Sequence, residues 1–386
     1  MKGLKCINCG HVHGATMIYQ CSQCNGTLDV FYDYDTLFEM DSQGSQNSSG
    51  IWKYRNLMPV DEDVEPVTLG EGNTPLLKSR VLEEAFGQTE IFIKNEAVNP
   101  TLSFKDRPLA VALTIAKQWN VAGVLTASTG NTGVAAAAYA ARAGIPCQIY
   151  VPESTPKEKL IMMEMYGAEI KLVPGNFSDA YKMAGEEAEK RGWFNLTSTF
   201  LNPYAIEGDK TLAYEIYEQY GGVPDWIVIP IGAGPLLVSC FKGFKELRLA
   251  GKITKMPRMV GVQAANCAPI VQAYEAGGKE VQPWMHSSQT VASGIADPLT
   301  TYPQDGTRTL ATIYESEGCA IGVEDEKILH FQKHLARTEG IFAEPASITS
   351  VAALEKMKEK GYVKQDQSVV VVITGHGLKD LKSIKK

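Results

Sequence analysis

Several features are missing from this sequence of 386 residues, and each absence excludes a class of protein. The longest uncharged stretch, Gln118 to Ala141, contains three glycines and several threonines, so a membrane span is not expected. No apolar run follows the first lysines, so a secretory signal is not expected either. Eight cysteines in this length are too few for a disulfide scaffold, which favours a reducing, cytoplasmic location.

Positive charge is scarce as well. Lysine and arginine total 37 against 44 aspartate and glutamate residues, which gives a net charge of −7 with no basic block. Nucleic acid and anionic membranes are therefore not expected as partners. Glycine-rich turns occur at 128–133 and 232–234, but neither has the P-loop pattern, and no acidic residue follows at the spacing that binds a ribose. Such turns can present N–H groups to a carboxylate or phosphate, and plain tight turns look the same.

The remaining composition is that of a globular protein, with 44% hydrophobic and 21% charged residues. The length suits two α/β domains. Short apolar runs alternate with helical stretches, which favours parallel sheets with helices on both faces. The expected strands are Val121–Ala127, Cys147–Val151, Ile170–Val173, Trp193–Leu196, Trp226–Ile231, Met259–Val262 and Ser368–Ile373.

Four of the cysteines form two Cys-x2-Cys pairs near the N-terminus: Cys6, Cys9, Cys21 and Cys24. Two such knuckles complete a tetrahedral thiolate set, which predicts a structural zinc ribbon over residues 1–40 with no open coordination position. Free thiols or a disulfide are the alternative. A module this small is expected to need its metal to fold. Residues 41–50, rich in Ser, Gln and Gly, predict a linker.

Lys105 is the candidate catalytic residue. It lies where a loop enters a predicted helix, Pro108 to Gln118, and both a helix N-terminus and Arg107 disfavour the ammonium form. The carboxylate of Asp106, in contrast, favours the ammonium form. In isolation, a solvated surface lysine is the alternative interpretation.

From residue 68 onward the chain resembles the fold-type II pyridoxal-phosphate enzymes, and within them threonine synthase. The resemblance implies two α/β domains of the tryptophan synthase β type. The large domain would comprise 51–114 and 201–386, and the small domain 115–200, with the cofactor in the cleft between them. It also implies an amino acid as substrate and a homodimer, and a zinc ribbon is common in such chains. The matching motifs, in order, are Thr68–Leu76, Asn99–Arg107, Ala127–Thr132, Ile206–Thr211, Pro230–Gly234, Gly261–Ala265, Glu344–Ser347 and Thr374–Asp380.

The resemblance assigns roles to individual residues. Lys105 would form the Schiff base with pyridoxal 5'-phosphate and then carry protons at Cα and Cβ of the substrate. Asn131 would bind the cofactor's phenolic oxygen, and Thr374 would face its pyridine nitrogen. The remaining assignments are the cofactor phosphate to Gly232, Ala233 and Gly234, and the substrate carboxylate to Ser128, Thr129 and Thr132. The ribbon contributes no residue to these motifs, so we expect catalysis to be separable from it.

Departures from the threonine synthase pattern concern the substrate. The family usually has glycine where this chain has Leu102, and Pro235 follows the phosphate turn although proline has no N–H. The family's arginine that grips the substrate phosphate is replaced by Ala205, and Thr199 and Phe200 stand in place of an Asn-Ser pair. Lysines that could compensate are Lys157, Lys159 and Lys210.

Two activities therefore stay open. The first is the threonine synthase reaction, O-phospho-L-homoserine plus water to L-threonine and phosphate. The second is β-elimination or β-replacement on a different, possibly non-phosphorylated, amino acid, which the loss of the arginine favours. A non-catalytic binding module built around the ribbon is a third reading, but it has no use for Lys105. His376 is a further candidate near the cofactor ring.

Overall fold

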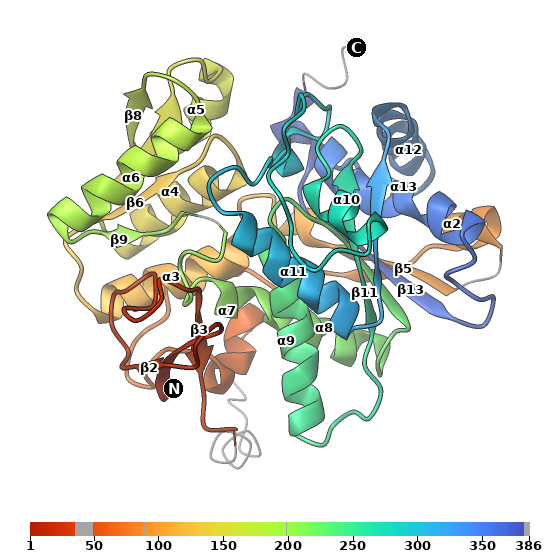
Figure 1. The fold of residues 1–386 in the computed structure, drawn as a ribbon, viewed down its shortest axis with the longest axis horizontal. Coiled ribbons are helices and arrows are strands. Elements are labelled where there is room, and N and C mark those ends of the chain that lie inside the picture. The colour runs from red at the N-terminus through yellow and green to blue at the C-terminus, as the bar shows by residue number, and fades with distance from the viewer. Residues whose placement is uncertain (35–48, 88–89, 198, 382–386) are drawn as a thin grey trace. The chain divides into compact units, whose positions relative to one another are not determined.

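The computed structural model describes residues 1–34, 49–87, 90–197 and 199–381. These fall into two compact units, shown within the ribbon of Figure 1. The first unit comprises Met1–Asn73 and Lys105–Thr211, and the second comprises Thr74–Phe104 and Leu212–Lys386. Each unit is described by itself below.

The first unit begins with a small antiparallel sheet. Its strands β1 (Gly3–Cys6), β2 (Val12–His13) and β3 (Leu28–Phe31) pair in the order β2-β1-β3. This sheet and its connecting turns, residues 1–34, are called the N-terminal module below. Most of the expected linker lies outside the described residues, and its last residue, Gly50, already begins the 3-10 helix η1 (Gly50–Leu57).

A parallel sheet forms the other half of the first unit. Within the described residues its order is β8-β7-β6-β9, and helices connect the strands. Successive residues of a strand point to opposite faces. Accordingly Val124 and Ile149 pack with α4, whereas Leu125 and Tyr150 pack with α6. The elements are β6 (Val124–Ala127), α4 (Asn131–Ala143), β7 (Cys147–Pro152), α5 (Lys157–Met165), β8 (Glu169–Val173), α6 (Phe177–Arg191) and β9 (Phe194–Asn195).

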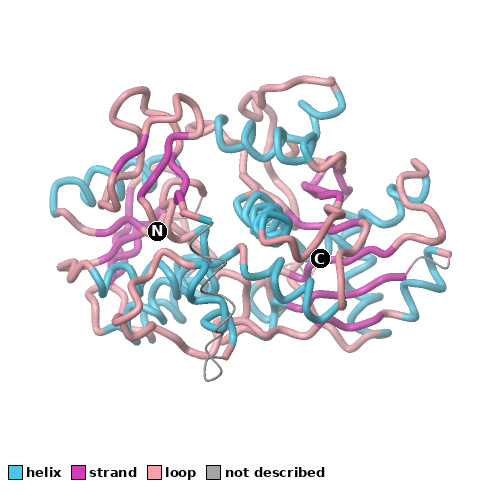
Figure 2. The backbone as a smooth tube through the Cα atoms, turned by 90° about the horizontal axis from the view of Figure 1, so that it is seen from below, coloured by secondary structure: helices cyan, strands magenta, loops and turns pink. Residues whose placement is uncertain are grey.

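The second unit contains a larger sheet, whose order among the described residues is β12-β11-β10-β13-β5-β4. All neighbouring pairs are parallel except β4 with β5. Strands and helices are distinguished by colour in Figure 2. The strands are β4 (Leu76–Lys78), β5 (Glu90–Asn95), β10 (Trp226–Pro230), β11 (Arg258–Ala264), β12 (Cys319–Val323) and β13 (Ser368–Ile373).

Helices bury both faces of this sheet. Alternate strand residues such as Val228 and Val371 join the apolar cluster of α13 and α12. On β11, Gly261 faces Leu237 of α9 and Ile313 of α11. The helices are α2 (Arg80–Phe86), η2 (Glu96–Val98), α8 (Thr211–Tyr220), α9 (Pro235–Leu249), α10 (Pro269–Glu275), η3 (Ser293–Ile295), α11 (Pro303–Glu315), α12 (Asp325–Thr338), α13 (Pro345–Glu359) and η4 (Gly377–Lys379).

The parallel α/β architecture is as expected, but the compact units do not divide at the expected limits. The predicted large domain included residues 51–73, 105–114 and 201–211, and all three segments belong to the first unit; the predicted boundary at 114/115 falls inside helix α3 (Asp106–Gln118). The reason is packing, because α3 is buried along most of its length against α4 and α7 (Ile206–Asp209). In the part of the chain that is described, no helix is long and apolar enough to cross a membrane.

Candidate active site

Lys105 is the residue directly before helix α3, in helical backbone geometry, and its carbonyl accepts the first helical hydrogen bond from Leu109. Its side chain is only partly buried, while Asp106 and Arg107 beside it are fully buried. Desolvation lowers the pKa of the Lys105 amine, and the charge of Asp209 partly opposes this shift. A lysine with a lowered pKa is suited to act as a nucleophile or base.

Helix α7 lies against the start of α3. A methyl group at Gly208 would come within 2.1 Å of the Arg107 carbonyl oxygen, so only glycine allows this approach. Arg107 Nη1 donates to Thr211 Oγ1 over 2.9 Å, and Thr211 Oγ1 donates to the Gly208 carbonyl over 2.7 Å. The motifs around Lys105 and Ile206–Thr211 therefore form one buried contact.

The turn before α4 is closed by Ser128. Its hydroxyl accepts from the N–H groups of Gly130, at 3.2 Å, and Gly133, at 3.0 Å. Helix α4 then starts at Asn131, and Ser128 and Thr132 are both buried. A helix N-terminus of this kind favours an anionic group such as a carboxylate.

The Thr68–Leu76 motif is hydrogen-bonded to the same helix, α4, through Glu71. The carboxylate of Glu71 is fully buried and accepts hydrogen bonds from Trp52 Nε1 at 2.7 Å and Tyr139 Oη at 2.8 Å. The hydroxyl of Thr68 and the N–H of Leu69 donate to the same carboxylate. Glu71 thus ties the motif to α4, and this supporting role was not foreseen from the sequence.

The second unit holds the other glycine turn. Gly234 has φ +97°, and a methyl group there would lie 2.4 Å from Thr309 Cγ2. Both the backbone conformation and the lack of space therefore require glycine. The carbonyls of Ala233 and Gly232 accept from Thr309 Oγ1 at 2.5 Å and Gln263 Nε2 at 3.3 Å. The turn is therefore fixed through its carbonyl groups.

The N–H groups of this turn differ from its carbonyl groups in their hydrogen bonding. Among the residues that the structure describes, no hydrogen bond is donated by the N–H of Gly232, Ala233 or Gly234. Ala233 and Gly234 are buried, and buried N–H groups are normally paired. Three N–H groups without a bond, two of them buried, directly before the 15-residue helix α9 fit a phosphate group. Pro235 occupies the first position of α9, where a missing N–H has no helical partner to lose.

Thr374 follows strand β13 and is buried. Its hydroxyl is 2.9 Å from that of Ser347 on α13, and Ser347 Oγ also accepts from the Gly375 N–H. The backbone of Ser103 pairs with Gly375, and within the described part of the chain the buried Ser103 hydroxyl has no hydrogen-bond partner. A polar group of a bound ligand would satisfy it. Both serines lie inside matched motifs, which was the available signal for them.

His376 has a local structural role. Its Nδ1 accepts from the Leu378 N–H and caps η4, and its ring packs edge-on against Phe342. Burial lowers its pKa, so the neutral form that can accept this bond is favoured.

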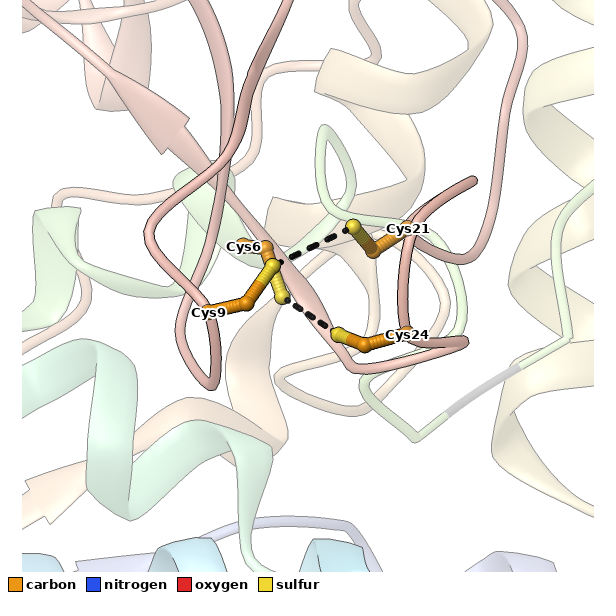
Figure 3. Close-up of side chains that lie close together, drawn as sticks. All are labelled: Cys6, Cys9, Cys21 and Cys24. Atoms are coloured by element: carbon orange, nitrogen blue, oxygen red, sulfur yellow. Dashed lines mark hydrogen bonds between the residues drawn. The ribbon is translucent and has the colours of Figure 1, made fainter.

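The four cysteines of the N-terminal module converge (Figure 3). The distance from Cys6 Sγ to Cys24 Sγ is 3.5 Å, that from Cys9 Sγ to Cys21 Sγ is 3.6 Å, and all four sulfur atoms lie within 4.8 Å of one another. Sulfur atoms about 2.3 Å from a tetrahedral zinc stand about 3.8 Å apart. The donor set and its spacing therefore fit zinc, and the four cysteines are not joined as disulfides.

Comparison with known proteins connects these features. Residues 67–375 match the family described as pyridoxal-phosphate dependent enzyme. This chain belongs to that family. The threonine synthase of Methanocaldococcus jannaschii is 39% identical, over 97% of this chain and 92% of its own. That of Methanosarcina acetivorans is 40% identical, over 100% of this chain and 94% of its own. The protein is thus a threonine-synthase-like, pyridoxal-phosphate-dependent lyase.

Solved structures agree on the fold of the enzyme. Serine racemase from Dictyostelium discoideum superposes with a TM-score of 0.65 at 24% identity, covering 78% of this chain and 92% of its own. The processed form of threonine deaminase isoform 2 from Solanum lycopersicum has a TM-score of 0.68 at 20% identity, covering 97% and 98%. The fold-type II architecture expected from the motifs is confirmed.

The predicted site residues of this enzyme divide between the units. Lys105 and the turn residues Ser128, Thr129, Asn131 and Thr132 belong to the first unit, and Gly232, Ala233, Gly234 and Thr374 belong to the second. In the second unit, the unused N–H groups of the Gly232–Gly234 turn and the Ser103 hydroxyl fit pyridoxal phosphate.

The positions that depart from the threonine synthase pattern have distinct environments. Leu102 has φ +63°, a left-handed conformation that costs a non-glycine residue about 1–2 kcal/mol. Ala205 is buried directly before α7, and its N–H donates to Asn202 Oδ1. Lys210 is fully buried and pairs with Glu207 over 2.7 Å, so its charge is already engaged inside the first unit. Lys210 is therefore a poor substitute for the missing arginine.

Proposed function

We propose that this enzyme is a threonine synthase, which converts O-phospho-L-homoserine and water to L-threonine and phosphate. One observation carries the proposal: relatives with that name are 39–40% identical over nearly the whole chain, including the N-terminal module. When bound, pyridoxal phosphate supplies the electron sink that makes proton removal next to the amino group feasible.

The residues of this chain supply binding and proton transfer. The N–H groups of Gly232, Ala233 and Gly234 would hold the cofactor phosphate, and Thr374 would serve as a neutral partner for the pyridine nitrogen. Lys105 binds the cofactor covalently and then takes and returns protons at Cα and Cβ of the substrate, a task that its lowered pKa favours. The turn of Ser128, Thr129 and Thr132 at the start of α4 holds the substrate carboxylate, and Asn131 holds the cofactor's phenolic oxygen.

Lys105→Ala tests the cofactor assignment. We expect turnover to fall by several orders of magnitude, while Lys117→Ala, an exposed lysine on the same helix, leaves it unchanged. Borohydride reduction followed by peptide mapping should place the pyridoxyl group on Lys105. Its recovery on another lysine would overturn the assignment.

A second candidate is β-elimination or β-replacement on an amino acid without a phosphate. Ala205 favours it, because no guanidinium stands at the position where the family binds the substrate phosphate, and Lys210 is paired with Glu207. Phosphate release from O-phosphohomoserine, measured beside keto-acid formation from serine and threonine, separates the two candidates.

Ala205→Arg sharpens this test. If the native substrate carries no phosphate, the new guanidinium should raise kcat/KM for O-phosphohomoserine by about tenfold or more, since a charge-assisted contact is worth more than about 1.4 kcal/mol. Ala141→Arg, at an exposed position of α4, is the matched control. Efficient wild-type turnover with no gain from the arginine would support threonine synthase.

The N-terminal module holds a structural zinc through Cys6, Cys9, Cys21 and Cys24 in this proposal. Four thiolates close the coordination sphere, so the metal would stabilise the module and take no part in the chemistry. Metal analysis of the reduced protein should find one zinc per chain, and its absence from carefully purified samples would contradict the proposal.

A further inference from the structure

The N-terminal module is joined to helix α7 by a buried charged contact. Tyr32, one residue after β3, donates its hydroxyl to Glu207 Oε2 over 2.6 Å. Lys210 Nζ lies 2.7 Å from the same oxygen and 4.3 Å from the centre of the Tyr32 ring. The side chains of Glu207 and Lys210 are fully buried. A buried carboxylate is held by all the groups that bond it, so Tyr32 contributes directly to the position of α7.

Helix α7 packs directly against the first turn of α3. Gly208 lies against the Arg107 carbonyl so closely that no side chain fits, and Thr211 links the Arg107 guanidinium to the Gly208 carbonyl. Arg107 is two residues after Lys105. Asp209, also on α7, is the charged group whose field acts on the Lys105 amine. A displacement of α7 therefore changes both the backbone next to Lys105 and the charge that faces it.

Other contacts show that the module is an integral part of the first unit. Leu4, Leu28 and Tyr32 share one apolar cluster with the buried residues of α3 and α4. The Tyr204 hydroxyl bonds both the N–H and the carbonyl of Thr16, and the Tyr19 hydroxyl accepts from the Asn195 N–H over 2.6 Å. The expectation that catalysis is separable from the module is therefore not supported.

We propose that Tyr32 is a positioning residue for Lys105, acting through Glu207 and helix α7. The N-terminal module then contributes to catalysis as well as to stability, because it holds the segment that carries Asp209 against the start of α3. This inference rests on the proposed function only for the choice of substrate, because the placement of Lys105 matters to any activity of the enzyme.

Tyr32→Phe removes the hydroxyl and keeps the ring. Tyr19→Phe is the matched control, because it removes another tyrosine hydroxyl that joins the module to the rest of the first unit, but at β9 instead of α7. We expect both variants to lower Tm by a similar amount. Only Tyr32→Phe should lower kcat, by about tenfold or more with little change in KM, since a misplaced reacting group loses rate before affinity.

A readout that does not depend on turnover is the pH midpoint of the visible absorbance of the bound cofactor. Asp209 favours the protonated form at Lys105, so loosening α7 should move this midpoint to lower pH, by about 0.5 unit or more. In Tyr19→Phe the midpoint should match that of the wild type.

Equal shifts of midpoint and kcat in both variants would mean that Tyr32 acts only through general stability, and no shift in Tyr32→Phe would also refute the proposal. A midpoint shift in an enzyme that does not consume O-phosphohomoserine would support the positioning role while refuting the proposed reaction. The two conclusions are thus tested separately.

Discussion

Gly208→Ala is the substitution whose outcome follows most directly from the structure. The added methyl group would stand 2.1 Å from the carbonyl oxygen and 2.6 Å from the carbonyl carbon of Arg107. Ordinary van der Waals contact begins near 3.4 Å, so the two segments must separate by about an ångström. Both partners are backbone, so no side-chain rotation can relieve the clash.

The expected loss of stability can be bounded. Overpacking of a well-packed interior costs about 1–3 kcal/mol, and the better helix propensity of alanine recovers about 0.5–1 kcal/mol of it. A net loss of about 1–2 kcal/mol corresponds to a fall in Tm of roughly 1–3 °C in a chain of 386 residues. Because α7 would move away from Lys105, we also expect kcat to fall by about tenfold or more.

Thermal unfolding and steady-state kinetics of the holoenzyme measure both effects. Gly185→Ala in α6 is the control, because an added methyl group there meets no atom within 4 Å and alanine should stabilise the helix by about 0.5–1 kcal/mol. If Gly208→Ala is as stable and as active as the wild type, the close approach of α7 to Arg107 is not real, and the argument for positioning through α7 fails with it.

Four further outcomes follow from individual residues. Gly234→Ala should weaken cofactor binding by about tenfold or more in an absorbance titration, because its φ of +97° and its contact with α11 both disfavour a side chain. Burial raises the pKa of the Cys147 and Cys319 thiols to about 12, so both should resist iodoacetamide at pH 8 in the native protein and react after unfolding, as mass spectrometry would show. Cys6→Ser should abolish zinc binding in metal analysis and lower Tm. Leu102→Gly should be more stable than Leu102→Ala by about 1 kcal/mol in denaturant unfolding, since only glycine relieves the left-handed strain, and equal stabilities would contradict the strain.

The elements that could be predicted were those with a local signal. Strands β7 and β13 are rich in apolar residues, with one polar residue each, and the observed bounds agree with the expected ones to within a residue. Strand β5 was not predicted, because Glu90 and Lys94 interrupt its apolar pattern. Lys94 is nevertheless fully buried, where it pairs with Glu215 over 2.7 Å. Its partner is 121 residues away in the sequence, so no local pattern could reveal that a charged residue belongs to the core.

The site residues show the same difference between local signals and contacts of distant residues. The sequence alone supplied the candidates: the resemblance to fold-type II pyridoxal-phosphate enzymes pointed to Lys105 and to the glycine turn at Gly234, and the Cys-x2-Cys spacing pointed to the four clustered cysteines. Only the tertiary structure decided which charges are available, because the pairing of Lys210 with Glu207 and the contact of Tyr32 with Glu207 depend on burial. Tyr32 and Glu207 are 175 residues apart, and a hydrogen bond over that separation exists only once the chain has folded.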